Sequence, residues 1–177
     1  MKRSRSPLHQ FDMKRLHATL DGERRARALS WVELTNEINK PFEGTPSIPI
    51  GVSTIRGVPT KSSVASTVVL QVLRWLRRTP ESFLAISNAL PRSEEVLPDP
   101  GPSRILRFDT KALYAALNAK RSERGLTWQQ VAGELPGFTV GMLTNLSSGP
   151  LIAFPGVMIL IQWLRLSAAS FVRGRSR

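Results

Sequence analysis

The sequence contains no cysteine and only two histidines, and these absences exclude several classes of site. Without cysteine there is no disulfide framework, no thiolate nucleophile and no cysteine-type zinc site, which is typical of a reducing cytoplasm. His9 and His17 have no second histidine or carboxylate cluster at metal-ligand spacing, so we expect both to be solvated rather than to bind a metal. We find no catalytic constellation. We therefore expect neither an enzyme nor a bound cofactor.

Long hydrophobic runs are absent as well. The longest apolar stretch, residues 151–164, is interrupted by Pro155 and Gly156 and is shorter than the roughly 20 residues that a membrane-spanning helix needs. The first residues, MKRSRSPLHQ, are basic but lack the apolar segment of a signal peptide. These features predict a protein that has no membrane segment and stays in the cytoplasm.

Acidic residues are scarce relative to basic ones. The 177 residues include 25 Lys and Arg but 13 Asp and Glu, for a formal net charge of +12. Such an excess is typical of proteins that bind nucleic acids. An ordinary basic protein and, less favoured, a membrane-surface protein are the alternatives on charge alone.

The chain contains an internal repeat at an offset of 97 residues. Between residues 11 and 38, 11 of 28 positions are identical to those 97 residues further on. Unrelated sequence would give about two identities, from average residue usage. The identical pairs begin with Phe11 and Phe108, and include Asp12 and Asp109, Arg24 and Arg121, Arg27 and Arg124, Trp31 and Trp128, and Glu37 and Glu134.

The repeat resumes near the end of each copy at an offset of 88. Trp75-Leu76-Arg77 matches Trp163-Leu164-Arg165, so the first copy carries nine extra residues, which we place in the Pro- and Gly-rich loop 39–50. The segment 89–104, which is rich in proline, reads as an extended linker. The predicted organisation is a basic arm (1–10), a first domain (11–88), this linker, a second domain (105–173) and a basic tail (174–177).

Each copy has the pattern of several short helices. In the second copy, residues 108–125 favour a helix that ends at Gly125, and Thr127 with Gln130 forms a capping box that starts the next helix. Ser30 with Glu33 repeats this capping box in the first copy. Pro136-Gly137 then ends the second helix, and Thr139 caps a third. Two short helices around a tight turn are typical of a helix-turn-helix, although a plain helical bundle would contain similar signals.

The segment LTWQQVAGELPGFTVGMLTNLSSG resembles the core of the lambda-repressor-like, XRE-type helix-turn-helix family, here present as two tandem copies. The resemblance extends to the preceding helix and to the closing segments QWLRLSAASF and RWLRRTPESFL, and so covers almost the whole chain. It implies an all-α fold of two tandem four- to five-helix domains joined by a Pro-rich linker. It also implies DNA binding in a bacterial or phage regulator, on the nucleoid of a bacterial cytoplasm.

The resemblance places the groove-facing residues of each third helix. In the second copy they are Gly141, Thr144, Asn145 and Ser148. Asn can pair with adenine, and Thr and Ser can contact several bases, but this set includes no Arg or Lys.

In the first copy the groove-facing residues are Ser53, Arg56, Gly57 and Thr60, with Lys61 beside them. Arg56 is suited to bidentate contact with guanine. Because Gly57 and Pro59 interrupt the helix, we expect it to be kinked or to end near Val58.

Phosphate contacts are predicted at the N-termini of the second helices, at Ser30 and Thr127, and in the basic arm, at Lys2, Arg3 and Arg5. Arg173, Arg175 and Arg177 form a similar basic tail, although charged tails are usually only solvated.

The last helix of each copy, residues 64–76 and 157–166, is apolar around more than one face. We expect the other copy to cover it, as in a dimer of single-domain repressors, and a protein partner or homodimer could use the same surface. Trp75 and Trp163 would lie near that contact, or else in the core of their own copy.

These features predict a sequence-specific, double-stranded-DNA-binding transcriptional regulator that presents two recognition helices from one chain. The alternative is a protein-interaction scaffold built from degenerate helix-turn-helix domains that no longer read DNA. An RNA-binding protein is less favoured because Tyr114 is the only tyrosine and the pattern shows no aromatic platform.

Overall fold

The computed structural model describes residues 7–58, 60, 65–85, 96–101, 103–148 and 152–175. Several predicted features lie outside these residues: Lys2, Arg3 and Arg5 of the arm, Lys61, residues 89–95 of the linker, and residues 176–177 of the tail.

The first repeat is a chain of helices around a buried apolar helix. It contains α1 (Met13–Ala26), α2 (Trp31–Asn39), the 3₁₀ turn η1 (Lys40–Phe42), α3 (Val52–Arg56), α4 (Ser66–Leu76) and the 3₁₀ turn η2 (Pro80–Phe83). Asp12 caps α1 by accepting a hydrogen bond from the Arg15 N–H. Ser30 and Glu33 form the expected capping box at the start of α2, which confirms that prediction.

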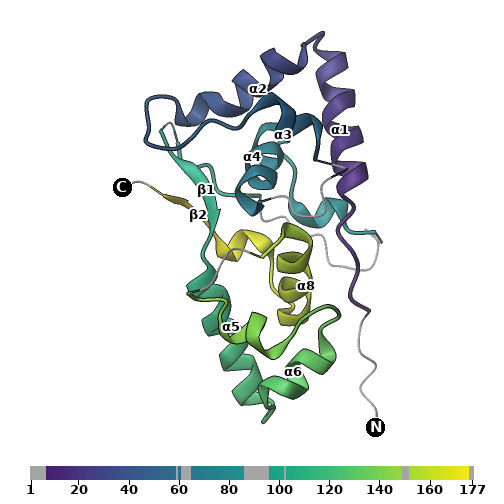
Figure 1. The fold of residues 1–177 in the computed structure, drawn as a ribbon, viewed down its shortest axis with the longest axis vertical. Helices are drawn as coiled ribbons and strands as arrows, with labels where there is room; N and C mark the ends of the chain where they lie inside the picture. Colours follow the sequence, from purple (N-terminus) through teal and green to yellow (C-terminus); the bar gives the residue numbers. More distant parts are fainter. Residues whose placement is uncertain are drawn as a thin grey trace.

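The second repeat has the same order of four α-helices and a final 3₁₀ turn, and adds two strands. It contains β1 (Ile105–Phe108), α5 (Thr110–Glu123), α6 (Trp128–Glu134), α7 (Val140–Thr144), α8 (Phe154–Leu164), the 3₁₀ turn η3 (Ala168–Phe171) and β2 (Val172–Arg175). Asp109 caps α5, and Thr127 with Gln130 forms the second predicted capping box. The structure therefore repeats the helices that the sequence repeat predicts (Figure 1).

A two-stranded antiparallel sheet joins the two ends of the second repeat. β1 pairs with β2 so that Phe108 faces Val172 and Leu106 faces Gly174. In the first repeat the equivalent residues, Phe11 and Leu84, form a single β-bridge. Residues 174 and 175, which we assigned to a basic tail, are part of β2.

The two repeats share one core. Phe154 of α8 packs against Phe11 at 4.7 Å and against its repeat equivalent Phe108 at 5.6 Å between ring centroids. Buried leucines of both repeats belong to the same hydrophobic cluster, among them Leu16, Leu20, Leu70, Leu113, Leu117 and Leu160.

Each last helix binds the segment that leads into the other repeat. Gln71 of α4 donates to the backbone carbonyl of Leu106 (3.0 Å), and Gln162 of α8 donates to the carbonyl of His9 (2.7 Å) and accepts from its N–H (2.8 Å). His9 and Leu106 occupy equivalent positions at the offset of 97. The contact between the repeats is therefore reciprocal.

The prediction of an all-α fold made of two tandem domains joined by a linker is thus wrong. The chain has a small sheet, β1 lies on α4 of the first repeat, and the core is continuous across both repeats. The described end of the linker also belongs to this structure, because Leu97 is buried and Asp99 forms an ion pair with Arg74 of α4 (3.0 Å).

The nine-residue insertion forms a closed loop between α2 and α3. The side chain of Asn39 bridges the loop base, donating to the Ile50 carbonyl and accepting from the Ile50 N–H, both at 2.9 Å. Phe42 anchors the loop in the core, whereas Ile48 at its tip is 88% exposed. The first repeat therefore departs from a tight helix-turn-helix, while α6 and α7 are joined by a short turn.

Candidate nucleic-acid interface

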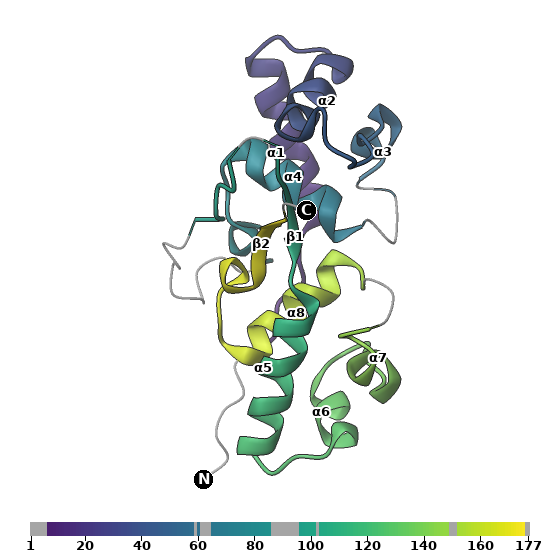
Figure 2. The same ribbon diagram turned by 90° about the vertical axis from the view of Figure 1, so that its left-hand side faces the viewer.

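The short helices α3 and α7 lie along the same side of the elongated molecule, one in each repeat (Figure 2). Ile55 of α3 and Leu143 of α7 are fully buried and fix each helix against its own repeat. In the second repeat Val131, Leu135 and Leu146 are buried as the helix-turn-helix pattern requires, and Val140 is half-buried. The outer residues of both helices therefore face solvent on one side of the protein.

In the first repeat, Ser53 and Arg56 are exposed on α3. The helix ends at Arg56, because Gly57 acts as its C-cap and donates its N–H to the Ser53 carbonyl at 3.0 Å. Thr60 is exposed but lies in the following turn, where its hydroxyl donates to the Gly57 carbonyl at 3.0 Å. Arg56 is thus the cation on this helix.

In the second repeat, Gly141 and Asn145 are exposed and Thr144 is half-buried. The Thr144 hydroxyl donates to the Val140 carbonyl (3.0 Å), and Asn145 is the C-cap of α7. Ser148 is exposed in the turn that follows. Asn145 therefore presents the amide best suited to contact a base edge.

The sequence-based prediction did not include Met142 among the exposed residues of the third helix. In the structure its side chain is 41% exposed beside Gly141. The signal was present, because an apolar residue stands in α7 directly before the buried Leu143.

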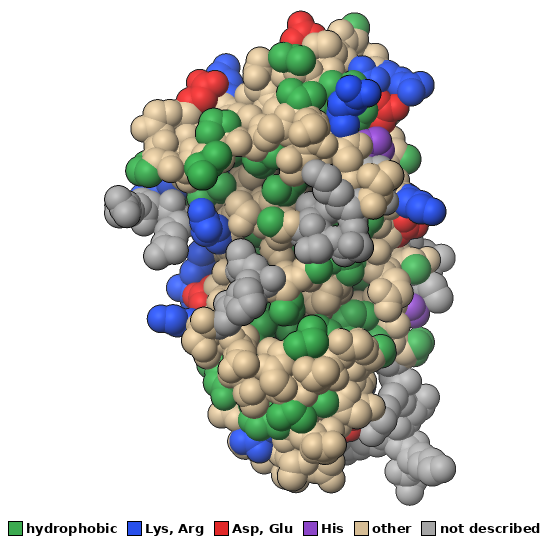
Figure 3. All heavy atoms as spheres, in the orientation of Figure 1, with side chains coloured by type: hydrophobic (Ala, Val, Ile, Leu, Met, Phe, Trp, Pro, Cys, Tyr) green, Lys and Arg blue, Asp and Glu red, His purple; other side chains and the backbone are tan. Residues whose placement is uncertain are grey.

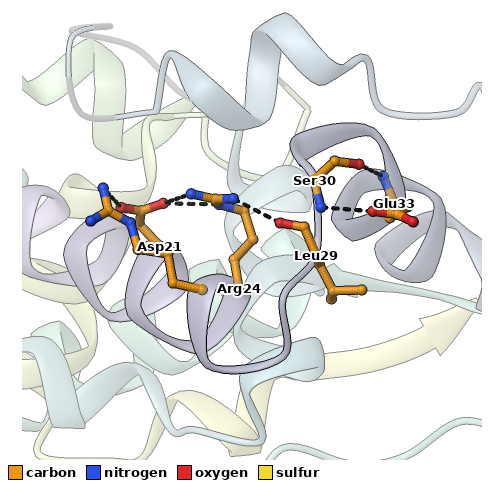
Figure 4. A network of polar contacts seen from close by, with 6 residues as sticks. Asp21, Arg24, Leu29, Ser30 and Glu33 are labelled. Atoms are coloured by element: carbon orange, nitrogen blue, oxygen red, sulfur yellow. Dashed lines mark hydrogen bonds and ion pairs between the residues drawn. The ribbon is translucent and has the colours of Figure 1, made fainter.

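The N-termini of α2 and α6 differ in charge although both are closed by capping boxes. The Ser30 hydroxyl accepts from the Glu33 N–H (3.2 Å), and a Glu33 carboxylate oxygen accepts from the Ser30 N–H (2.7 Å; Figure 4). This backbone hydrogen bond holds the pKa of Glu33 below its usual value. In α6 the neutral Gln130 makes the equivalent bonds to Thr127. The start of α2 thus carries an acidic side chain and that of α6 a neutral one, which disfavours a further anion at Ser30 more than at Thr127.

Arginines at the corner before these helices are used internally. Arg24 binds Asp21 (2.7 Å) and donates to the Leu29 carbonyl (2.7 Å), as Figure 4 shows. It also lies 4.7 Å from the Trp31 ring. Its repeat equivalent Arg121 makes the matching bond to the Leu126 carbonyl at 2.8 Å. These guanidinium groups therefore stabilise the turn between the two helices through bonds within the protein.

The basic side chains gather at the rim of the α3–α7 side rather than over its middle. Figure 3 views this side and shows Lys and Arg at its upper right and along its left edge, where Figure 1 has β1 and β2. The described surface between these groups is mostly neutral. Electrostatic attraction to a polyanion would therefore come mainly from the rim.

The two tryptophans of the last helices belong to their own repeats. Trp75 donates its indole N–H to Glu37 of α2 (2.8 Å), and Trp163 donates to Glu134 of α6 (2.9 Å). The apolar residues of α8, among them Met158 and Leu160, lie in the shared core.

His9 is buried and His17 is half-buried, so the expectation that both are solvated is wrong. His9 is 8% exposed and its backbone is held by Gln162, while His17 stacks on Trp31 at 5.5 Å between ring centroids. The residues that the structure describes include no group of three His, Cys, Asp or Glu that could hold a metal ion. Within the same residues, no helix has the length and apolar character needed to cross a membrane.

Comparison with known proteins found no match. No family model, no curated protein and no solved structure matches it. The resemblance to the lambda-repressor-like helix-turn-helix family therefore stays a prediction that rests on the residues quoted above.

Proposed function

We propose that this protein binds double-stranded DNA in a sequence-specific manner and regulates transcription, with α3 and α7 as its two reading elements. The observation that carries this proposal is their place on one side of the molecule, one from each repeat (Figure 2). Paired helix-turn-helix units contact half-sites about one DNA turn, roughly 34 Å, apart. A single chain with this arrangement would act as a dimer does.

The chemistry of the two helices supports unequal half-sites. Arg56 is exposed at the end of α3 and is suited to guanine, whereas Asn145 at the end of α7 is suited to adenine. The predicted operator is therefore asymmetric. Such a regulator would act on the nucleoid of a bacterial cytoplasm.

A protein-interaction role is the second candidate, and one feature favours it. The second reading surface has no Lys or Arg among its predicted contacts and exposes Met142. Flexible apolar side chains of this kind are common at protein-binding surfaces.

Binding to duplex DNA separates the two candidates. DNA selected from a random-sequence pool would be titrated with the protein by fluorescence anisotropy at several salt concentrations. The DNA proposal predicts binding that weakens steeply with salt. Arg56→Ala should cost about 1–3 kcal/mol on the selected sequence, which is roughly 5- to 150-fold in affinity, and much less on unrelated DNA.

A matched control is Arg78→Ala, because Arg78 is also exposed and lies after α4, outside the reading helices. It should bind the selected sequence nearly as the wild type does. Absence of any binding at low salt would reject the DNA proposal and leave the interaction role.

A further inference from the structure

The outer face of the β1–β2 ribbon carries arginines at directly opposed positions. Arg107 of β1 faces Arg173 of β2, and Ile105 faces Arg175. Because side chains alternate along a strand, Ile105, Arg107 and Arg173 share one face, on which Ile105 is buried, while Leu106, Phe108 and Val172 are buried on the other face. Arg107 and Arg173 are both exposed.

This arrangement is electrostatically unfavourable for the protein alone. Like charges directly opposite each other in a sheet are destabilising. Arg173 is partly compensated by an ion pair with Asp109 (3.0 Å), whose other carboxylate oxygen caps α5. The side chain of Arg107 makes no hydrogen bond or ion pair with the described residues. Asp109 thus compensates Arg173, whereas the side chain of Arg107 has no acidic partner among the described residues.

The first repeat provides an internal comparison, because it makes the same backbone pairing without charge. Gln10 and Ala85 occupy the positions of Arg107 and Arg173, and the Ala85 N–H donates to the Gln10 carbonyl at 3.0 Å. The pairing therefore does not need arginine at either position. The positive charge of the β1–β2 ribbon therefore requires another explanation.

The β1–β2 ribbon lies near α3, the proposed DNA-reading helix of the first repeat. A groove of about 490 Å³ is lined by residues 46–51 of the insertion loop, by Thr54 of α3, by Thr67 and Val68 of α4, and by Ile105 and Arg107 of β1. In Figure 2 the ribbon lies at the middle of the molecule, and α3 and α7 lie at its right-hand edge. A duplex held by α3 would thus pass close to Arg107.

We propose that the β1–β2 ribbon is a second contact surface for the nucleic-acid backbone, in which Arg107 and Arg173 bind phosphates of the DNA that α3 and α7 read. This inference rests on the proposed function. The opposed guanidinium groups repel each other in the free protein, and a phosphate between or beside them would relieve that repulsion. The ribbon would add affinity without sequence preference, since phosphate contacts carry no base information.

The test is the double variant Arg107→Gln, Arg173→Ala, which copies the neutral pair of the first repeat. Loss of two phosphate contacts should lower the slope of log affinity against log salt by about 1.8. Between 50 and 200 mM salt the variant should therefore lose roughly 12-fold less affinity than the wild type does. Discrimination between selected and unrelated DNA should not change.

A charge-matched control is Lys14→Gln, Arg78→Gln, which removes two exposed cations from α1 and from the turn after α4. Its salt slope should equal that of the wild type. Because Arg173 also binds Asp109, Arg107→Gln alone is the second test, and it should lower the slope by about 0.9.

Three results would overturn the inference. A wild-type slope in both ribbon variants, with Arg56→Ala still weakening binding, would reject the ribbon and leave the DNA function intact. An equal loss of slope in the control variant would show that net charge alone is responsible. Failure of the wild-type protein to bind DNA at low salt would reject the DNA function and the ribbon together.

Discussion

Glu134 links three elements of the second repeat, and its removal should show how far burial strengthens such a link. Both carboxylate oxygens accept from Arg124, at 2.7 and 2.9 Å, and one also accepts from the Trp163 indole N–H at 2.9 Å. The first repeat has the same set in Glu37, Arg27 and Trp75, but there the arginine lies 3.8 Å away.

The two carboxylates differ in exposure, and this difference sets the expected magnitudes. The Glu134 side chain is 9% exposed and that of Glu37 is 43% exposed. In Glu134→Ala the buried Trp163 N–H loses its partner, which costs about 1–3 kcal/mol, and Arg124 loses a bidentate ion pair. In Glu37→Ala the partners regain water, so the cost should be about 0.5 kcal/mol.

Thermal unfolding followed by circular dichroism measures this contrast. For a chain of this size about 1 kcal/mol corresponds to roughly 2–4 °C in Tm. Glu134→Ala should lower Tm by roughly 4–8 °C and Glu37→Ala by roughly 1–2 °C. Equal Tm shifts in the two variants, or a larger shift for Glu37→Ala, would refute the reasoning that burial decides the cost.

Three further predictions concern the sheet, the contact between the repeats and the helix cap. In Gly174→Ala the added Cβ would overlap the Pro100 ring, so the free energy of unfolding in urea should fall by about 1–3 kcal/mol; an unchanged midpoint would contradict this packing. Gln162→Ala removes both hydrogen bonds to the His9 backbone, and the amide hydrogen of His9 should exchange faster with solvent, while unchanged exchange would mean that Gln162 does not hold this segment. The lowered pKa of Glu33 means that its ionised form contributes stability above its unfolded pKa of about 4.3, and that this contribution is lost as the pH falls through the lower folded value. The stability difference between wild type and Glu33→Gln should therefore shrink between pH 5 and pH 3, and a constant difference would argue against the cap.

Local features of this fold could be predicted from the sequence because they depend on neighbouring residues. The capping boxes at Ser30 and Thr127 are each made within four residues. The end of α3 near the Gly57-Val58-Pro59 segment follows from backbone chemistry. The buried positions of α6 and α7 follow from helical periodicity, and the exposure of Arg56 and Asn145 follows from the same pattern.

The sheet could not be predicted because both strands are short and far apart in the sequence. β2 reads Val-Arg-Gly-Arg, and two arginines and a glycine have the composition of a solvated tail. Its partner β1 lies about seventy residues earlier, next to a segment whose prolines favour a linker. Gly174 is needed only in the folded structure, because there Pro100 packs against it and leaves no room for a Cβ atom. Nothing in the neighbouring sequence indicates this contact.

The shared core could be predicted from the sequence only in part. The apolar composition of α4 and α8 indicated that something must cover them. Nothing local indicated that Gln71 and Gln162 would bind the backbone of the other repeat, or that His9 would be enclosed by that contact.

The central claim is that α3 and α7 read two half-sites on one duplex, and a hydroxyl-radical footprint on the selected DNA tests it most directly. We predict two protected patches of unlike sequence whose centres lie about one helical turn, roughly 34 Å, apart. Arg56→Ala should weaken protection in one patch and leave the other. A single protected patch, or no protection at saturating protein, would contradict the account.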